Sequence, residues 1–152
     1  MTIIDRIKEL NIDIPDAPGP VGAYVAFKKT NNLIFISGQL PLKKDGQLIK
    51  GKIGKDLTLE EGQEAAKLCL INILAQTKKA VDGDLNKIKS CLKITGYVNS
   101  SDEFTDQPKV INPASELLNS IFGDDGKHAR AAVSVNSLPL GVAVEIDAIF
   151  EY

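Results

Sequence analysis

The sequence is poor in the residues that build metal sites and disulfides. Its 152 residues contain two cysteines, Cys69 and Cys91, and a single histidine, His128. No Cys-x-x-Cys pair occurs, which argues against a zinc site built from histidine and cysteine. The two cysteines could form one disulfide, but each falls in an apolar pattern, where a thiol more often is a small buried hydrophobe. We therefore expect neither a metal nor another cofactor.

The chain also lacks an excess of positive charge and any long apolar run. Its formal net charge is −2, so nothing in the balance supports binding by neutralisation of phosphates, and we expect no nucleic-acid partner. The charged N-terminus lacks the apolar core of a signal peptide. No apolar run approaches the roughly 20 residues needed to cross a bilayer. We expect a cytoplasmic protein with no membrane partner.

What is present is the composition of a folded globular chain. Hydrophobic residues make up 43% and charged residues 25% of the sequence. This length fits one domain with its own core. We expect a single domain over residues 1–152, in which 1–16 form an N-terminal helical extension and coil.

Apolar periodicity predicts alternating strands and helices. A short helix is expected at 2–10, and two long helices are expected, one beginning at Thr58 with a Thr-x-x-Glu capping box and one ending before Gly123. Strands are expected at 23–29, 33–40, near 47–50, and at 88–98, 130–136 and 142–152. Turns at 30–32 and 138–141 are expected to join the first two and the last two long strands as hairpins. The fold class is therefore α+β, one mixed sheet with two helices on one face.

The last two strands carry the most informative polar pattern. If the apolar side chains of each strand meet the helices, Arg130 and Glu145 both point away from them, beside the small residues Ala132 and Ser134. A bare, half-apolar sheet face favours oligomerisation, and a cavity there with one arginine and one glutamate suits an anionic ligand. The alternative is a surface ion pair across the hairpin, which the spacing alone favours.

Two other residues have ambiguous roles. His128 has no partner for a catalytic triad in the sequence pattern and is interpreted as a surface loop residue beside Gly126. Tyr24, at the start of a strand, is either a packing aromatic or the wall of a pocket.

The segment from Arg130 to Glu145, Arg-Ala-Ala-Val-Ser-Val-Asn-Ser-Leu-Pro-Leu-Gly-Val-Ala-Val-Glu, resembles the C-terminal signature of the RidA-like (YjgF-like) reactive-intermediate-deaminase family. Three more segments agree with the family: Gly-Pro-Val-Gly-Ala-Tyr at 19–24, Ile-Ser-Gly-Gln-Leu-Pro at 36–41, and Val-Ile-Asn at 110–112. The match covers residues 17–152, and the chain resembles a longer branch of the family.

The resemblance implies a chorismate-mutase-like fold and a homotrimer whose three sheets form a central barrel, with clefts between subunits. It implies hydrolysis of 2-aminoacrylate-type enamines and imines to 2-keto acids and ammonia. Arg130 would hold the substrate carboxylate, since a guanidinium binds it in bidentate fashion. Glu145 would position and deprotonate water. The resemblance also assigns supporting roles: Tyr24 closes the cleft, Gly38 and the main chain of Ala132 contact substrate or water, and Asn112 supports the site.

The chain departs from the family at one site position and in two segments. Many relatives carry cysteine or serine where this chain has Ala132, so that side chain contributes no chemistry. The N-terminal helix and the long 43–57 loop are additional, which leaves the substrate open. Two other functions remain: an endoribonuclease activity attributed to some family members, and a trimer that binds a small carboxylate without turning it over.

Overall fold

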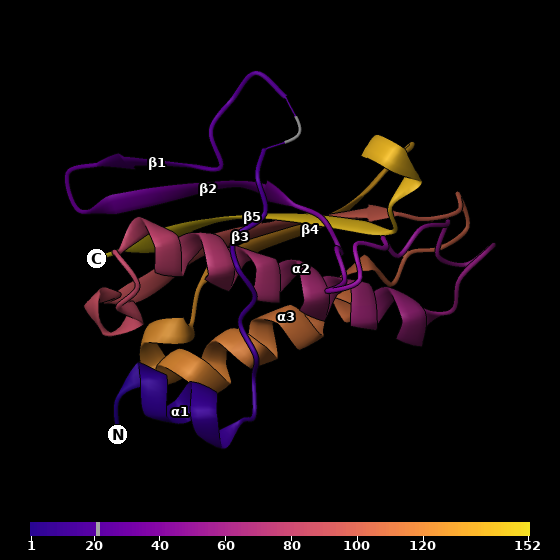
Figure 1. Ribbon diagram of the computed structural model, residues 1–152. Coiled ribbons are helices and arrows are strands. Elements are labelled where there is room, and N and C mark those ends of the chain that lie inside the picture. Colours follow the sequence, from indigo (N-terminus) through magenta and orange to yellow (C-terminus); the bar gives the residue numbers. More distant parts are fainter. Residues whose placement is uncertain (21) are drawn as a thin grey trace.

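A five-stranded mixed sheet forms the frame of the computed structural model, which describes residues 1–20 and 22–152 (Figure 1). The strand order is β1-β2-β5-β3-β4. The strands are β1 (Phe27–Thr30), β2 (Leu33–Gln39), β3 (Ser90–Asn99), β4 (Ala129–Val135) and β5 (Val144–Glu151). All neighbouring pairs are antiparallel except β3 and β4, which run parallel. This arrangement confirms the expected α+β class and the mixed sheet.

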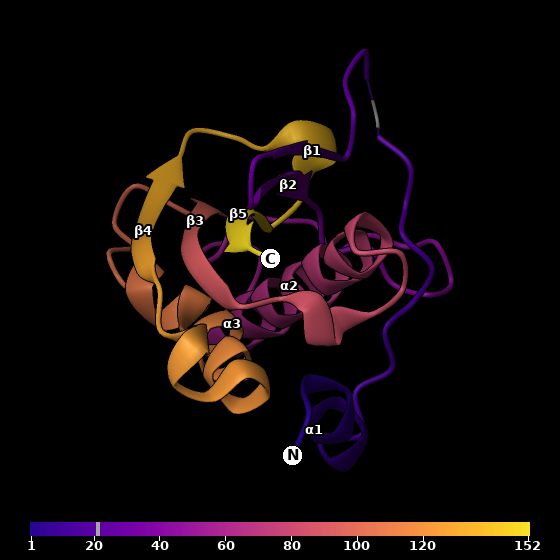
Figure 2. The same cartoon turned by 90° about the vertical axis from the view of Figure 1, so that its left-hand side faces the viewer.

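The two long helices cover one face of this sheet, as the sequence predicts (Figure 2). They are α2 (Leu59–Ala80) and α3 (Gln107–Phe122). Thr58 caps α2, and its hydroxyl accepts from the backbone N–H of Glu61 while the Glu61 carboxylate accepts from that of Thr58, which is the predicted capping box. The short helix α1 (Ile3–Glu9) lies outside α3 and is tied to it by a hydrogen bond from Arg6 to the carbonyl of Ile121. No α-helix of the described chain covers the opposite face of the sheet, and only the short 3₁₀ helix η3 (Pro139–Gly141) lies on that side, at one end (Figure 1).

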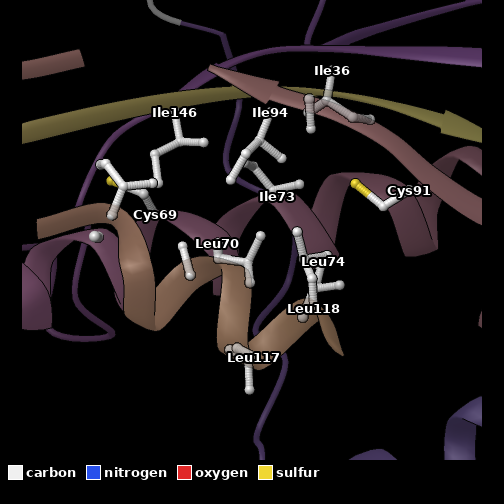
Figure 3. Close-up of a cluster of buried hydrophobic side chains, with 14 of the residues drawn as sticks. Ile36, Cys69, Leu70, Ile73, Leu74, Cys91, Ile94, Leu117, Leu118 and Ile146 are labelled. Carbon is white, nitrogen blue, oxygen red and sulfur yellow. The ribbon is translucent and has the colours of Figure 1, made fainter. Parts of the chain in front are cut away.

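The core lies between the helices and the covered face of the sheet (Figure 3). Its labelled members include Ile73 from α2, Ile94 from β3 and Ile146 from β5, each fully buried. Cys69 and Cys91 lie in the same core and are not disulfide-bonded. Burial raises the pKa of the Cys91 thiol to about 12, so this thiol is not a nucleophile at neutral pH. Both cysteines are therefore small core hydrophobes, as interpreted.

The expected hairpin between the last two long strands is wrong. β5 does not pair with β4; it lies between β2 and β3. Helix α3 connects β3 to its parallel neighbour β4. Helix α2 connects β2 to β3, which are also parallel but are not adjacent, so one strand position is left between them. β5 fills that gap and satisfies the backbone hydrogen bonds of both β2 and β3. Helical crossovers, and not sequence proximity, therefore decide which strands are neighbours.

Smaller differences concern strand ends. The hairpin between β1 and β2 is present, with Asn31 at a φ of 51° in its turn, but β1 begins at Phe27 and not at 23. The strand expected near 47–50 is reduced to isolated bridges, of Leu48 with Leu42 and of Lys50 with Val142. The 43–57 loop is therefore tied to the start of β5 without adding a strand to the sheet.

Helix α3 contains Pro113 in its interior and remains helical. Proline has no N–H, so the carbonyl four residues earlier, at Lys109, loses its usual helix partner. The side chain of Gln63 on α2 donates to this carbonyl at 2.8 Å. The cost of the proline is thus reduced by a contact between the two helices. Helix α3 therefore continues through Pro113, and its residues Asn112 and Ser115 both reach Arg130 on β4.

Gly126 holds the turn before β4 tightly against α3. It ends the 3₁₀ helix η2 (Gly123–Gly126), and a Cβ there would lie 2.3 Å from the backbone carbonyl oxygen of Leu118. Because backbone cannot move aside as a flexible side chain can, we expect Gly126→Ala to lower the free energy of unfolding by about 1–3 kcal/mol. Urea unfolding at one protein concentration measures this.

Gly19→Ala is the matched control, since a Cβ at Gly19 meets no atom within 4 Å. We expect this substitution to leave the unfolding midpoint nearly unchanged. Equal effects of the two substitutions would show that the close approach of Gly126 to α3 does not limit stability.

Candidate functional site

Arg130 lies on the helix side of the sheet and not on the open face. Its parallel partner on β3 is Ile94, which in turn is paired with Ala148 on β5, and both of these side chains are buried beneath the helices. Side chains of paired residues point to the same face, so Arg130 points toward α3. The expectation that Arg130 faces away from the helices is therefore wrong, because β4 is an edge strand whose helix-facing side is only partly covered.

The guanidinium of Arg130 is held by neutral oxygen atoms of α3. Its Nη1 donates to Asn112 Oδ1 at 3.0 Å and to Ser115 Oγ at 3.2 Å, and its Nη2 approaches the carbonyl oxygen of Pro108 at 3.5 Å. No carboxylate of the described residues lies within 4.0 Å of it. No described acidic side chain therefore compensates its positive charge. Its Nε edge makes no hydrogen bond to any described residue, and this edge is the one that binds a carboxylate side-on.

Ala132 follows two residues later on the same side of β4. Its side chain packs against the core below α3. β4 pairs only with β3, so the backbone of Ala132 belongs to an edge that no other strand of the described chain covers. We name Asn112, Ser115, His128, Arg130 and Ala132 the arginine half-site.

Glu145 lies on the open face, as the alternation of β5 predicts. Its neighbour across β5 and β3 is Tyr97, and the residues before and after it, Val144 and Ile146, are fully buried under the helices. The carboxylate packs on the backbone of Gly38, where a Cβ would lie 2.6 Å from Glu145 Oε1. A side chain at position 38 would force the Glu145 carboxylate to shift, and Gly38 lies within the register irregularity between β2 and β5.

The surroundings of Glu145 raise the pKa of its carboxyl group. Its partial burial raises the pKa of the carboxyl group above its usual value, and the negative charge of Asp147, on the same face, raises this pKa further. The hydroxyl of Tyr97 donates to Asp147 at 3.1 Å, which keeps that second carboxylate in place. A carboxylate with a raised pKa is a stronger base than an ordinary one, which suits proton abstraction from water.

Tyr24 lies near Gly38, and the two residues line the same pocket. Tyr24 and Gly38 line an apolar pocket of about 140 Å³, together with leucines that include Leu48 and Leu140. Tyr24 is therefore a pocket wall, the second of the two interpretations left open by the sequence. Val21, within the same motif, lies outside the described residues. We name Tyr24, Gly38 and Glu145 the acidic half-site.

The two half-sites do not meet within one chain. Arg130 and Glu145 point to opposite faces of the sheet, and β3 runs between their strands, a lateral separation of about 10 Å. The surface ion pair that the sequence spacing favoured is therefore wrong as well. The structure brings Asn112 to Arg130, with Ala132 on the same side of β4, and it brings Gly38 to Glu145, with Tyr24 linked to Gly38 through the pocket. It keeps the two groups apart.

Sequence reasoning missed Ser115 and assigned no role to His128. The Nε2 atom of His128 lies 2.8 Å from Ser115 Oγ, which itself contacts Arg130. Two spacings could have found them. His128 stands two residues before Arg130, directly ahead of β4. Ser115 stands three residues after Asn112, on the same side of α3.

The open face also carries apolar side chains that nothing covers. Phe35 on β2 is 41% exposed and Val133 on β4 is 45% exposed. Exposed apolar side chains on a sheet face without a covering layer are consistent with contact to another protein chain. In the described chain no three histidine, cysteine or acidic side chains lie together as a metal site. No helix of residues 1–20 and 22–152 is long and apolar enough to cross a membrane.

Known proteins share this sequence over nearly its whole length. Residues 5–150 match the model of the family described as "YjgF/chorismate mutase-like, putative endoribonuclease". Protein TCP17 of Trypanosoma cruzi is 42% identical over 96% of this chain and 91% of its own length. A RutC family protein of Pyrococcus horikoshii is 31% identical over 88% of this chain and 90% of its own.

Solved structures agree with the sequence matches. A structure from Shewanella oneidensis, titled a "putative endoribonuclease", superimposes over 100% of both chains with a TM-score of 0.95 at 29% identity. E. coli TdcF, solved with bound serine, superimposes with a TM-score of 0.65 at 25% identity, over 90% of this chain and 93% of its own. The chain therefore has the chorismate-mutase-like fold, and it belongs to the YjgF/RutC family, as its C-terminal motif indicated.

Proposed function

We propose that this chain hydrolyses small enamines and imines of the 2-aminoacrylate type to 2-keto acids and ammonia, at sites formed between copies of the chain. The observation that carries the proposal is the guanidinium of Arg130, which is oriented by three neutral oxygens and neutralised by no carboxylate of the described residues. A positive charge held in one orientation, with its Nε edge open, is a receptor for a planar carboxylate.

The acidic half-site supplies the complementary chemistry. The enamine first tautomerises to the imine, whose carbon then accepts water. Glu145 takes a proton from this water as its oxygen bonds to the imine carbon, and the proton is passed to the nitrogen. The carbinolamine then releases ammonia and leaves the keto acid. The raised pKa of the Glu145 carboxyl group favours the first of these proton transfers.

Both half-sites can serve one substrate only if they come from different copies. This requirement, the bare sheet face with Phe35 and Val133, and the family fold together support a homotrimer whose sheets form a central barrel. Arg130 of one copy would then face Tyr24, Gly38 and Glu145 of its neighbour. The serine bound by TdcF is an amino acid with a carboxylate next to a nitrogen-bearing carbon, the same pair of groups as in the proposed substrate.

An endoribonuclease and a non-catalytic carboxylate-binding trimer are the competing functions. The family description supports the first, but the net charge of −2 and a lone histidine engaged by Ser115 and Gly126 do not favour RNA cleavage. Ala132 leaves the second open, since it brings no reactive side chain. Turnover of an imine separates the proposed enzyme from both.

Arg130→Ala is expected to reduce kcat/KM for 2-aminoacrylate roughly a hundredfold, because two charge-assisted hydrogen bonds to the carboxylate are lost. A dehydratase acting on serine generates the substrate, and pyruvate release is followed. Arg130→Lys keeps the charge but lacks the planar guanidinium, so its kcat/KM should lie between those of Arg130→Ala and the natural protein. Full activity in Arg130→Ala, or no acceleration by the natural protein, contradicts the proposal.

Mixing two inactive variants tests whether sites are shared between copies. Arg130→Ala and Glu145→Gln chains are each expected to be inactive alone. Refolded together in equal amounts, they should recover about a quarter of the natural activity, because a quarter of the sites then pair an intact Arg130 with an intact Glu145. If both residues acted from the same copy, no mixture would recover activity.

Asp147→Asn tests the basicity of Glu145. Glu145 acts as a base when deprotonated, so activity rises with pH through its pKa. Removing the negative charge of Asp147 lowers this pKa, and the acid limb of the pH profile of kcat/KM should move to lower pH. Glu151→Gln, which removes the same charge at the far end of β5, is the control and should leave the limb in place. A shift to higher pH in Asp147→Asn would contradict the assignment.

A further inference from the structure

The only histidine of the chain lies at the end of a short series of hydrogen bonds that leads to Arg130. His128 Nδ1 is 2.6 Å from the carbonyl oxygen of Gly126, and its Nε2 is 2.8 Å from Ser115 Oγ. Ser115 Oγ in turn lies 3.2 Å from Arg130 Nη1. Three elements meet in this series: the turn after α3, α3 itself and the edge strand β4.

The direction of each hydrogen bond in the neutral protein follows from the groups involved. A carbonyl oxygen only accepts, so His128 Nδ1 must carry the ring proton that it donates to Gly126. Nε2 is then an acceptor, and the hydroxyl of Ser115 donates its proton to it. This leaves the lone pairs of Ser115 Oγ directed to Arg130, whose guanidinium can only donate. With a neutral imidazole neither hydrogen bond of His128 can reverse, because the carbonyl of Gly126 cannot donate and Nε2 carries no proton.

The start of the series is fixed by packing. Gly126 is buried, and its α-carbon approaches the backbone of Leu118 so closely that no side chain fits. Its carbonyl therefore has one position relative to α3. Since Ser115 is on the same helix, the imidazole is held between two points of one rigid body.

We propose that Ser115 and His128 are positioning residues that orient the carboxylate anchor Arg130. Asn112 and Ser115 both accept from Nη1, and Nη2 donates to the carbonyl oxygen of Pro108 at 3.5 Å. This leaves Nε and the second hydrogen of Nη2 for the ligand. His128 acts at one remove, by fixing where the hydroxyl proton of Ser115 points. This inference rests on the proposed role of Arg130 as a carboxylate anchor.

The first arm of the test uses the ligand-free protein. A single histidine gives a single set of imidazole ¹⁵N signals, which distinguish the two neutral tautomers. The natural protein is expected to hold the Nδ1–H tautomer, and Ser115→Ala is expected to shift the signals toward a tautomer mixture. An Nε2–H tautomer in the natural protein, or identical signals in Ser115→Ala, overturns the proposal.

The second arm measures the binding of pyruvate, the keto-acid product, by calorimetry. Ser115→Ala and His128→Ala should each weaken binding roughly fivefold, the effect of losing the orientation of one hydrogen bond to a charged group. His128→Gln places an amide oxygen near the position of Nε2 and should restore most of the affinity. Ser120→Ala, the same change on α3 at a hydroxyl bonded only within its own helix, should bind like the natural protein.

The outcomes separate this inference from the proposed enzyme. Affinities of Ser115→Ala and His128→Ala equal to that of the natural protein overturn the positioning role, even if imines are hydrolysed. Pyruvate binding that is insensitive to Arg130→Ala overturns it too, since there is then no anchor to orient. Binding that depends on Arg130, Ser115 and His128, but without turnover of imines, leaves the positioning role standing and contradicts only the enzymatic proposal.

Discussion

The insertion of β5 between β2 and β3 is the constraint on which the rest of the site depends. It places Glu145 at the centre of the sheet, on the open face, with Gly38 of β2 beneath its carboxylate. It also leaves β4 at the edge, where Arg130 can reach over to α3. The two charged residues, fifteen positions apart in the sequence, end on opposite faces of the sheet. Under the proposed function, one chain carries both halves of the site and a second copy is needed to close it.

Each half-site is electrostatically incomplete in a way that the proposed substrate would correct. Arg130 has its geometry fixed by neutral acceptors and its charge left uncompensated. Glu145 is partly desolvated beside a like charge, which raises the pKa of its carboxyl group. A substrate with a carboxylate and an imine nitrogen, placed between two copies, would bind Arg130 through its carboxylate. Its hydrolysis would need a base to take a proton from water, and Glu145 would supply it. The exposed apolar residues of the open face would give the copies their contact.

Much of the fold could be predicted from the sequence because the signals were local. The capping box at Thr58, the strand alternation of β5 and the turn containing Asn31 each depend on a few neighbouring residues, and each was confirmed. Strand order depends on residues far apart in the sequence, and no residue pattern near Arg130 indicates that β5 lies between β2 and β3. The face of Arg130 is not local either: the apolar side of β4 was expected to meet the helices, but Val133 is exposed on the open face and Arg130 points to α3. The family motif pointed to Arg130 and Asn112, and the structure adds Ser115, which contacts Arg130, and His128, which contacts Ser115.

A crystal structure of the protein soaked with pyruvate tests most directly whether Arg130 and Glu145 of two copies share one site. We predict a trimer in which the carboxylate of pyruvate is bound by the Nε and Nη2 atoms of Arg130, with Glu145 of the adjacent copy beside the keto carbon. A crystal in which pyruvate avoids Arg130, or in which Arg130 is neutralised by a carboxylate of another copy, would contradict it.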